Sequence, residues 1–241
     1  MKILTKLLKG RRHICFLDFE GTQYTSEMIA FGGIIATVDK NGVIKNYRKP
    51  IEFYVKAKNK IGRFVEELTG IKQAKLDKVG IPFSRALKEI KQYCGINFKK
   101  TVFMTFGNHD MKILNQSISY NLDTPKDITE VIHHNYVDYQ SIISDYVRDE
   151  TGNPYSLANY LNIFNLEFSG TQHDPKDDAI NLMRLYDAFS KKQDIVLKEY
   201  LKALSSTRHL PSPIKKATEK LSKGEDVSSQ DFISYCEDDL K

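Results

Sequence analysis

The sequence predicts an α/β protein in which helices flank a mixed β-sheet. Runs of β-branched and aromatic residues fill much of the first 55 positions, and helix-period patterns then alternate with short apolar runs to about residue 190. Strands followed by strand–helix alternation are typical of a mixed sheet covered by helices. The 241 residues, 41% hydrophobic and 28% charged, suffice for one substantial globular domain with an appendage.

Three strands are predicted before the first helix. The first covers about residues 13–22, and the dense β-branched run Met28–Val38 forms a largely buried second strand. Asp39–Gly42 is a turn signal, so Val43–Val55 continues as a third strand. The fold therefore opens with a hairpin or a meander.

Two helices come next. Apolar residues at i, i+3, i+4 and i+7 predict a short amphipathic helix, ended by Thr69-Gly70, with the apolar face Ile61, Phe64, Val65 and Leu68. Pro82 begins a second helix and Gly95 ends it, with the inner face Phe83, Ala86, Leu87, Ile90 and Cys94.

The remainder of the main domain alternates between strands and helices. The predicted elements, in order, are a strand (Thr101–Phe106), a helix carrying Met111, Leu114 and Ile118, a loop (Asn121–Glu130, with Pro125), a short strand (Asn135–Asp138), a helix through Ile142, Ile143, Tyr146 and Val147, and two further helices (Tyr155–Phe164 and Asp178–Phe189).

A change of composition at about Ser205 predicts a boundary between a main domain, residues 1–204, and a C-terminal extension, residues 205–241. The extension begins with a linker rich in Ser and Pro. Ile214, Ala217 and Leu221 predict one short helix, and Ser228–Asp238 a second, which the capping-box pattern Ser228-x-x-Asp231 opens. Since the extension is too small for a core of its own, we expect it to dock on the main domain or on a partner.

Positive charge is concentrated between residues 45 and 100. This segment has 15 Lys and Arg and 5 acids, a local net charge of +10, in a chain whose net charge is +5. A basic segment in a chain that bears metal-binding acids elsewhere suits a protein that holds a polyanion near those acids. A lysine-rich solvated surface is the alternative.

The cysteines and the apolar runs indicate a cytoplasmic protein. Cys15, Cys94 and Cys236 are scattered without metal-ligand spacing, and their odd number disfavours a disulfide framework. No signal-peptide-like apolar stretch follows the basic segment Met1–Arg12, and no run approaches the roughly 20 apolar residues of a membrane span. We therefore expect no contact with a membrane.

Two acids close the first strand on one face. Side chains of a strand return to the same face every two residues, so Asp18 and Glu20 project together with Phe16. Leu17 and Phe19 pack the other face. Neighbouring acids at the end of a buried strand repel each other and lose solvation, and a divalent cation with oxygen ligands would compensate. A surface strand that carries two acids is the alternative.

Two further acids and a histidine follow downstream. Asp110 lies at a helix start after a buried strand, where stabilisation of the helix dipole is an alternative role. Asp178 lies in the first turn of an apolar-faced helix and would face inward, toward the sheet. His173 falls in the loop five residues earlier, where a plain surface histidine is the alternative.

Together these residues indicate one chemistry. Four converging carboxylates hold two divalent ions in enzymes that hydrolyse phosphodiesters, and an imidazole is suited to accepting a proton from the attacking water at neutral pH. The candidates are Asp18, Glu20, Asp110 and Asp178 for the metal and His173 for the proton.

Three segments resemble the motifs of the DEDDh 3′–5′ exonucleases, the superfamily of RNase T and of the proofreading subunits of DNA polymerases. They are Asp-Phe-Glu-Gly-Thr (18–22), Phe-Gly-Asn-His-Asp-x-x-x-Leu (106–114) and His-x-x-x-Asp-Asp-Ala-x-Asn (173–181). The closer similarity is to the branch of enhanced-RNAi and histone-mRNA end-trimming exonucleases and their bacterial relatives. Segments 64–71, 76–83 and 156–157 also resemble that branch, so the similarity spans about residues 12–190.

The resemblance implies an RNase H-like fold, with a five-stranded mixed sheet whose second strand is antiparallel. It also implies two Mg²⁺ ions, for which Mn²⁺ would substitute. By position, the metal ligands are Asp18, Glu20, Asp110 and Asp178, the catalytic residues His173 as general base and Glu20, and the contacts to the 3′-terminal nucleotide Gly21 and Thr22. Because the chain has no tryptophan, base stacking would fall to Phe or Tyr, such as Phe19, Tyr24 or Phe106.

The chain departs from the branch at two places. His109 stands before Asp110 where relatives more often carry an aromatic or bulky residue, and Pro175-Lys176 replaces small and apolar residues. Neither change removes a ligand. Pro175 would stiffen the loop that carries His173, and its effect on the placement of His173 stays open.

The sequence therefore predicts a metal-dependent 3′–5′ exonuclease that releases nucleoside monophosphates from single-stranded ends, with RNA slightly favoured over DNA by analogy with the branch. The Lys-rich segment 45–100 would follow the phosphate backbone. One alternative is a catalytically weak RNase H-like nucleic-acid-binding module that recruits a partner through its C-terminal tail. Another is a metal-dependent phosphatase of small nucleotides. A homodimer stays open, since RNase T-like relatives can dimerise.

Overall fold

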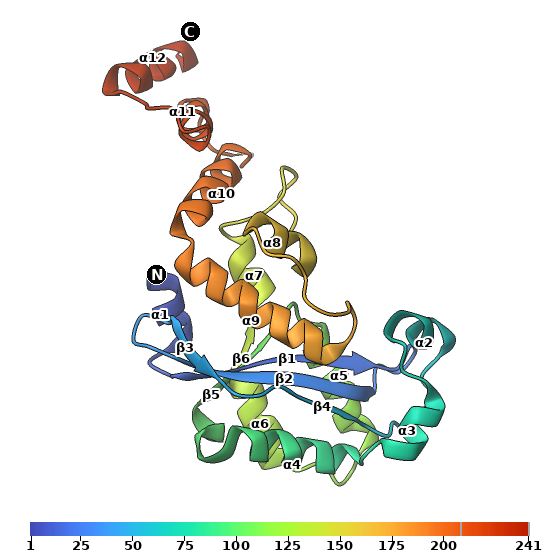
Figure 1. Ribbon diagram of the computed structural model, residues 1–241. Helices are drawn as coiled ribbons and strands as arrows, with labels where there is room; N and C mark the ends of the chain where they lie inside the picture. Colours follow the sequence, from blue (N-terminus) through green and yellow to red (C-terminus); the bar gives the residue numbers. More distant parts are fainter. Residues whose placement is uncertain (208, 241) are drawn as a thin grey trace.

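A six-stranded mixed sheet forms the centre of the protein, which is described by a computed structural model over residues 1–207 and 209–240 (Figure 1). The strands are β1 (His13–Gly21), β2 (Met28–Val38), β3 (Ile44–Tyr47), β4 (Ile51–Tyr54), β5 (Thr101–Thr105) and β6 (Tyr136–Asp138). The sheet order is β3-β2-β1-β5-β6, with β4 also on β2. The antiparallel second strand is confirmed, while β5 and β6 run parallel to β1.

The predicted single strand over residues 43–55 is wrong, because the chain makes two short strands there. Pro50 has no N–H to donate to a ladder and separates β3 from β4. β3 pairs with residues 36–38 of β2, and β4 pairs with residues 30–33. The two strands therefore share one position at the edge of the sheet, which explains six strands where five were expected.

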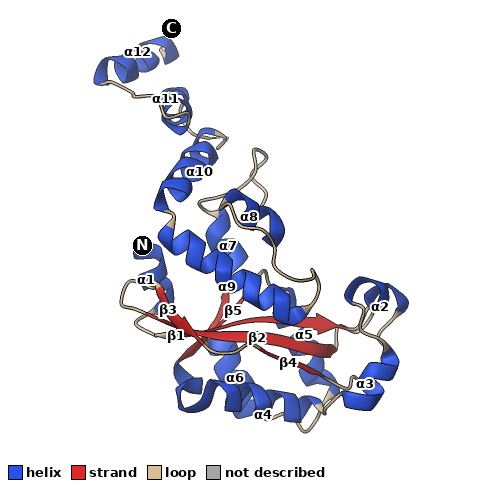
Figure 2. Cartoon of the chain, viewed as in Figure 1, coloured by secondary structure: helices blue, strands red, loops and turns tan. Residues whose placement is uncertain are grey.

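Helices cover both faces of the sheet (Figure 2). They are α1 (Lys2–Leu8), α2 (Arg63–Thr69), α3 (Gln73–Val79), α4 (Phe83–Cys94), α5 (His109–Tyr120), α6 (Lys126–His134), α7 (Tyr139–Ser144), α8 (Leu157–Ile163), α9 (Pro175–Lys191), α10 (Gln193–Ser205), α11 (Ser212–Ser222) and α12 (Ser229–Asp239), with a 3₁₀ turn over Gly95–Lys100. One core lies between the sheet and α1, α7, α8 and α9, and the other between the sheet and α4, α5 and α6.

The alternation along β1 divides these two cores as the sequence predicts. Phe16 packs edge-on against Tyr186 of α9, with ring centroids 5.4 Å apart. Leu17 and Phe19 belong to the opposite core, and Phe19 lies 5.8 Å from Phe31 between ring centroids. The side chains that alternate with Leu17 and Phe19 therefore face α9.

The predicted helix that ends at Thr69-Gly70 forms, but part of its predicted inner face is wrong, and so is the loop predicted over residues 121–130. In α2 only one of the helical positions, Val65, is buried, while Phe64 and Leu68 are 60% and 42% exposed. The predicted loop over residues 121–130 is interrupted by the start of α6, because Pro125 serves as a helix N-cap rather than as a loop residue. The sequence also misses α3, which buries only Leu76 and so has no apolar stripe to detect.

The C-terminal helices α10, α11 and α12 extend away from the sheet as an arm (Figure 1). Arg148 ties α10 to the body by donating to the Ala203 carbonyl at 3.2 Å and to Thr207 Oγ1 at 2.9 Å. Both predicted tail helices form, and the capping box at Ser228 and Asp231 is confirmed. None of the helices in the described part of the chain is long and apolar enough to cross a membrane.

Candidate active site

Two carboxylates of the site come from β1. Asp18 and Glu20 are half-buried and face α9, because Leu17 and Phe19 fill the core on the other side. Asp18 Oδ2 is buried, and it has no hydrogen-bond partner among the described residues. An acceptor without a donor inside a protein is costly, so this oxygen marks a place where a positive group is missing.

Asp110 joins β1 from the first turn of α5. Its side chain is 4% exposed, and its Oδ1 accepts a hydrogen bond from the Phe19 backbone N–H at 2.7 Å. Because β5 runs parallel to β1, the helix that follows β5 begins at the edge of the sheet where β1 ends. Topology therefore brings Asp110 to the two acids of β1.

Asp178 and His173 come from the start of α9 and the loop before it. Asp178 Oδ2 accepts from the His173 backbone N–H at 2.9 Å, and Asp174 caps the helix by accepting from the Asp177 N–H at 3.0 Å. His173 has φ of +65°, a left-handed conformation that is uncommon for residues other than glycine. The loop thus places a nitrogen of the exposed imidazole within 4.8 Å of a carboxylate oxygen of Glu20 on β1.

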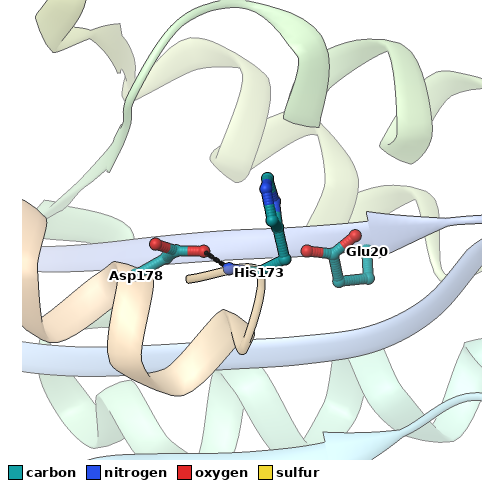
Figure 3. Close-up of side chains that lie close together, drawn as sticks. All are labelled: Glu20, His173 and Asp178. Atoms are coloured by element: carbon teal, nitrogen blue, oxygen red, sulfur yellow. Dashed lines mark hydrogen bonds between the residues drawn. The ribbon is translucent and has the colours of Figure 1, made fainter. Parts of the chain in front are cut away.

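Three of the predicted residues converge (Figure 3). Glu20, His173 and Asp178 each offer one potential ligand atom, and these atoms lie within 4.8 Å of one another. In the described part of the chain, Asp18 and Asp110 fall outside this group of three, but, in addition to burial, the charge of Asp110 raises the pKa of Glu20, and the charges of Glu20 and Asp178 raise the pKa of Asp18. The five residues therefore form one acidic cluster around the end of β1.

The carboxyl groups of the cluster have raised pKa values. Burial, and then the negative charges of Asp178 and Asp110, raise the pKa of Glu20 to about 8. Burial raises the pKa of Asp110 to about 7 and that of Asp178 to about 6, although a backbone N–H opposes each shift. Burial and then the charge of Asp110 raise the pKa of Asp18 well above its ordinary value.

These features fit a divalent cation. A buried carboxylate oxygen without a donor, four acids with raised pKa values, and three ligand atoms within 4.8 Å together lack only positive charge. Carboxylate oxygens suit hard divalent cations such as Mg²⁺ and Mn²⁺. The residues present could therefore hold the metal that the sequence predicts.

In the absence of divalent metal, the free energy of unfolding of the protein is expected to fall as the pH rises. A carboxyl group with a raised pKa keeps its proton in the folded state but has lost it in the unfolded state, so stability falls between about pH 4 and pH 8. Added Mg²⁺ would bind the ionised carboxylates, and it should therefore raise the melting temperature more at about pH 8 than at about pH 5. Thermal unfolding at both pH values, in EDTA and in Mg²⁺ at matched ionic strength, measures this. A metal-free melting temperature that rises through the same window contradicts it.

A cavity of about 280 Å³ opens beside the acids. Asp18, His173 and Asp178 line one side, and most of the remaining wall is apolar: Phe106, Leu157, Ala158, Phe168 and Leu182, with Leu17, Ser156 and Gln172 also at the lining. Phe106 is half-buried and lies edge-on to Tyr160, with ring centroids 5.9 Å apart. Phe168 and Gln172 were not predicted from the sequence, where only their nearness to His173 could have indicated them.

The turn after Glu20 is built from internal contacts. Thr22 is 3% exposed, and its hydroxyl accepts from the Glu27 N–H at 3.0 Å and lies 2.7 Å from Thr25 Oγ1. At Gly21 an added Cβ would come within 2.9 Å of Ile113 Cγ1, so α5 packs closely against this turn. Phe19, which was one candidate for base stacking, is only 3% exposed in the opposite core, and that role is wrong for it.

Helices cover both faces of a mixed sheet, and the acidic cluster lies at the end of its central strand, β1. The chain belongs to the RNase_T exonuclease family, whose family model matches residues 15–186. This confirms the family that the three motifs indicated. The acidic cluster lies within the matched segment.

Individual relatives are distant. Human ERI1 exoribonuclease 2 is 23% identical over 198 residues, which are 70% of this chain but 27% of that protein. The nuclease domain of 3′hExo, a DEDDh family member solved bound to rAMP, is 20% identical with a TM-score of 0.58, over 77% of this chain and 94% of that one. Exonuclease I of E. coli, solved in complex with a dT13 oligonucleotide, is 17% identical with a TM-score of 0.58, over 79% of this chain and 43% of that one. At such identities the likeness establishes the fold, which is RNase H-like as predicted.

Proposed function

We propose that the protein is a metal-dependent 3′–5′ exonuclease that hydrolyses single-stranded nucleic acid ends to nucleoside monophosphates. The observation that carries the proposal is the convergence of Glu20, His173 and Asp178 beside the buried Oδ2 of Asp18, which has no hydrogen-bond partner among the described residues. Membership of an exonuclease family supports the same reaction class.

Each residue has a chemical task in this proposal. Two Mg²⁺ ions, replaceable by Mn²⁺, would be held by Asp18, Glu20, Asp110 and Asp178 and would supply Lewis-acid stabilisation of the charge on the phosphate. His173 is exposed at the mouth of the site and would take the proton of the attacking water as general base. Glu20 would also orient the terminal nucleotide.

The terminal nucleoside would occupy the apolar cavity, where Phe106 offers a ring for the base and Gly21 and Thr22 lie at the end of β1. Four basic residues and no acid stand between residues 56 and 63, next along the chain from β4, and would follow the phosphate backbone. RNA is the substrate we favour, since a similar human protein is an exoribonuclease. DNA is the substrate to compare with RNA, because the similar exonuclease I was solved with a deoxyoligonucleotide.

A time course on 5′-labelled single-stranded RNA and DNA of matched sequence tests the proposal. It is run in Mg²⁺, in Mn²⁺ and in EDTA, with Asp178→Ala beside the wild type. A ladder that shortens from the 3′ end, and is lost in EDTA and in the variant, is the expected result. Retained gel-shift binding without shortening of either polymer would instead support the nucleic-acid-binding module.

Tyr24→Ala is expected to weaken substrate binding without slowing the chemical step. Tyr24 is 83% exposed four residues after Glu20, and its neighbour Gln23 accepts from the Phe64 N–H at 3.2 Å, so the turn is docked on α2. An exposed ring on a docked turn can stack with a base upstream of the scissile bond, which is worth about 1–3 kcal/mol. We expect KM to rise about tenfold or more with kcat unchanged. Tyr47→Ala, which removes a ring 63% exposed on β3, is the control and should leave KM unchanged.

A further inference from the structure

One row of residues crosses the sheet beneath the start of α9. Gly32 of β2 pairs with Asp18 of β1 on one side and with Glu52 of β4 on the other. Directly paired residues in neighbouring strands project to the same face of a sheet. Asp18 and Glu52 therefore flank a residue without a side chain, on the face that α9 covers.

The first turn of α9 lies directly on that gap. A Cβ added to Gly32 would come within 2.0 Å of the Pro175 carbonyl carbon and 2.1 Å of the Lys176 nitrogen, both of them backbone atoms. Backbone atoms cannot move aside as the end of a flexible side chain can. Only glycine at this position lets the helix approach so closely.

Lys176 extends from this turn to Glu52. Lys176 Nζ lies 3.5 Å from Glu52 Oε2 and 4.0 Å from Asp174 Oδ1. The other oxygen of Glu52, Oε1, accepts a hydrogen bond from the hydroxyl of Tyr54. Lys75 of α3 donates to that hydroxyl at 2.6 Å, and because an ammonium group can only donate, the phenol proton is directed to Glu52. Tyr54 thus orients Glu52 through a hydrogen bond, and Glu52 forms the ion pair with Lys176.

The same helical turn carries the catalytic loop on its other side. Asp178 follows Lys176 by two residues, and its Oδ2 accepts from the N–H of His173. A shift of the first turn of α9 would therefore move Asp178 and His173 together. Lys176 is 36% and Glu52 19% exposed, so solvent still reaches this ion pair. Such a pair adds little to overall stability, and its value lies in the placement of the helix.

We propose that Glu52 and Lys176 are positioning residues: their ion pair, above Gly32, holds the first turn of α9 so that Asp178 and His173 meet the acids of β1. This inference rests on the proposed exonuclease function for its kinetic test. It also assigns a role to Lys176, a residue at which the chain departs from the exonuclease branch that it resembles. Glu52, 32 residues from the nearest motif acid along the chain, Glu20, is not part of any motif.

A competing role for Lys176 is direct attraction of the phosphate backbone. The two roles differ in what happens when Glu52 is changed. Glu52→Gln keeps the lysine charge and can keep the bond from Tyr54, but it removes the charge that anchors Lys176. A positioning role predicts lower activity in this variant, whereas direct attraction predicts no loss.

The experiment compares the steady-state kinetics of wild type, Glu52→Gln, Lys176→Met, Lys176→Arg and the double variant Glu52→Gln/Lys176→Met on the labelled oligonucleotides. We expect kcat to fall about tenfold or more in both non-conservative single variants with KM unchanged, no further fall in the double variant, and near-complete recovery with Lys176→Arg. Lys191→Met removes an ion pair at the far end of the same helix, 2.8 Å to Asp187, and should leave kcat unchanged. Wild-type kcat in Glu52→Gln would overturn the proposal.

Hydrogen exchange separates failure of this proposal from failure of the proposed function. In EDTA, the peptide containing residues 170–178 should exchange faster in Glu52→Gln than in wild type, because the His173 N–H loses its fixed acceptor. Equal exchange in the two proteins would overturn the positioning role even if the enzyme is active. If wild type shortens neither polymer, the proposed function fails and the exchange comparison still decides the role of Glu52.

Discussion

Asp18→Asn is expected to give a protein that is inactive with metal and more stable without it. The side chain of Asp18 is surrounded by acids, its Oδ2 has no hydrogen-bond donor among the described residues, and burial with the charge of Asp110 raises its pKa well above the ordinary value. An amide of the same shape carries no charge and can donate to the neighbouring carboxylates. The repulsion that remains in the metal-free site is thereby reduced.

The two effects differ in size and can be measured separately. Loss of a metal ligand should remove about 4 kcal/mol of transition-state stabilisation, which corresponds to a fall in kcat of about 10³-fold. Relief of repulsion should raise the free energy of unfolding in EDTA by about 1 kcal/mol, which raises the melting temperature by about 2–4 °C in a chain of this length. Single-turnover rates in Mg²⁺ and thermal unfolding in EDTA give the two values.

Asp187→Asn is the matched control for this variant. Asp187 is another half-buried acid with an unpartnered oxygen, Oδ1, but it lies further along α9 and its Oδ2 pairs with Lys191 at 2.8 Å. Activity should be unchanged in this control, and no gain in stability is expected, since an ion pair is lost. A lower melting temperature of Asp18→Asn in EDTA would show that Asp18 is not a source of repulsion.

His173→Asn is expected to lower kcat by about 10²- to 10⁴-fold while leaving metal binding intact. Asparagine tolerates the left-handed conformation at this position better than most residues, and the backbone N–H that Asp178 accepts is retained. The substitution therefore removes the imidazole with little disturbance of the loop. Single-turnover rates at saturating Mg²⁺, together with the rise in melting temperature on adding Mg²⁺, measure the two properties.

The melting-temperature response distinguishes a general base from a ligand. The imidazole lies within 4.8 Å of the ligand atoms of Glu20 and Asp178, so coordination would be within its reach. If His173→Asn loses the Mg²⁺ response as Asp18→Asn does, the imidazole is a ligand and the base must be sought elsewhere. His133→Asn, which changes a histidine that bonds to Asn115 on the opposite layer, is the control and should behave as wild type.

The sequence predicts best those residues whose local pattern by itself decides which way their side chains face. Alternation along β1 places Asp18 and Glu20 on the α9 side of the sheet because side chains of a strand must alternate. The apolar face of α4 is buried as predicted. The helix α2 forms and ends where the sequence predicts, but Phe64 and Leu68 of its predicted inner face are exposed. The helix α3 was missed, because a single buried residue, Leu76, leaves no apolar stripe in the sequence.

By itself the sequence determined the mixed α/β fold, the exonuclease family and the segments that bring acids and a histidine to the end of β1, because those depend on periodicity and on motifs continuous in the chain. Only the tertiary structure decided that Asp18 Oδ2 lacks a donor among the described residues, that Glu20, His173 and Asp178 converge, and that Gly32 and Glu52 lie against the first turn of α9. Burial, charge coupling and cross-strand register join residues far apart in the chain. Such relations exist only once β1, β2 and β4 lie side by side beneath α9.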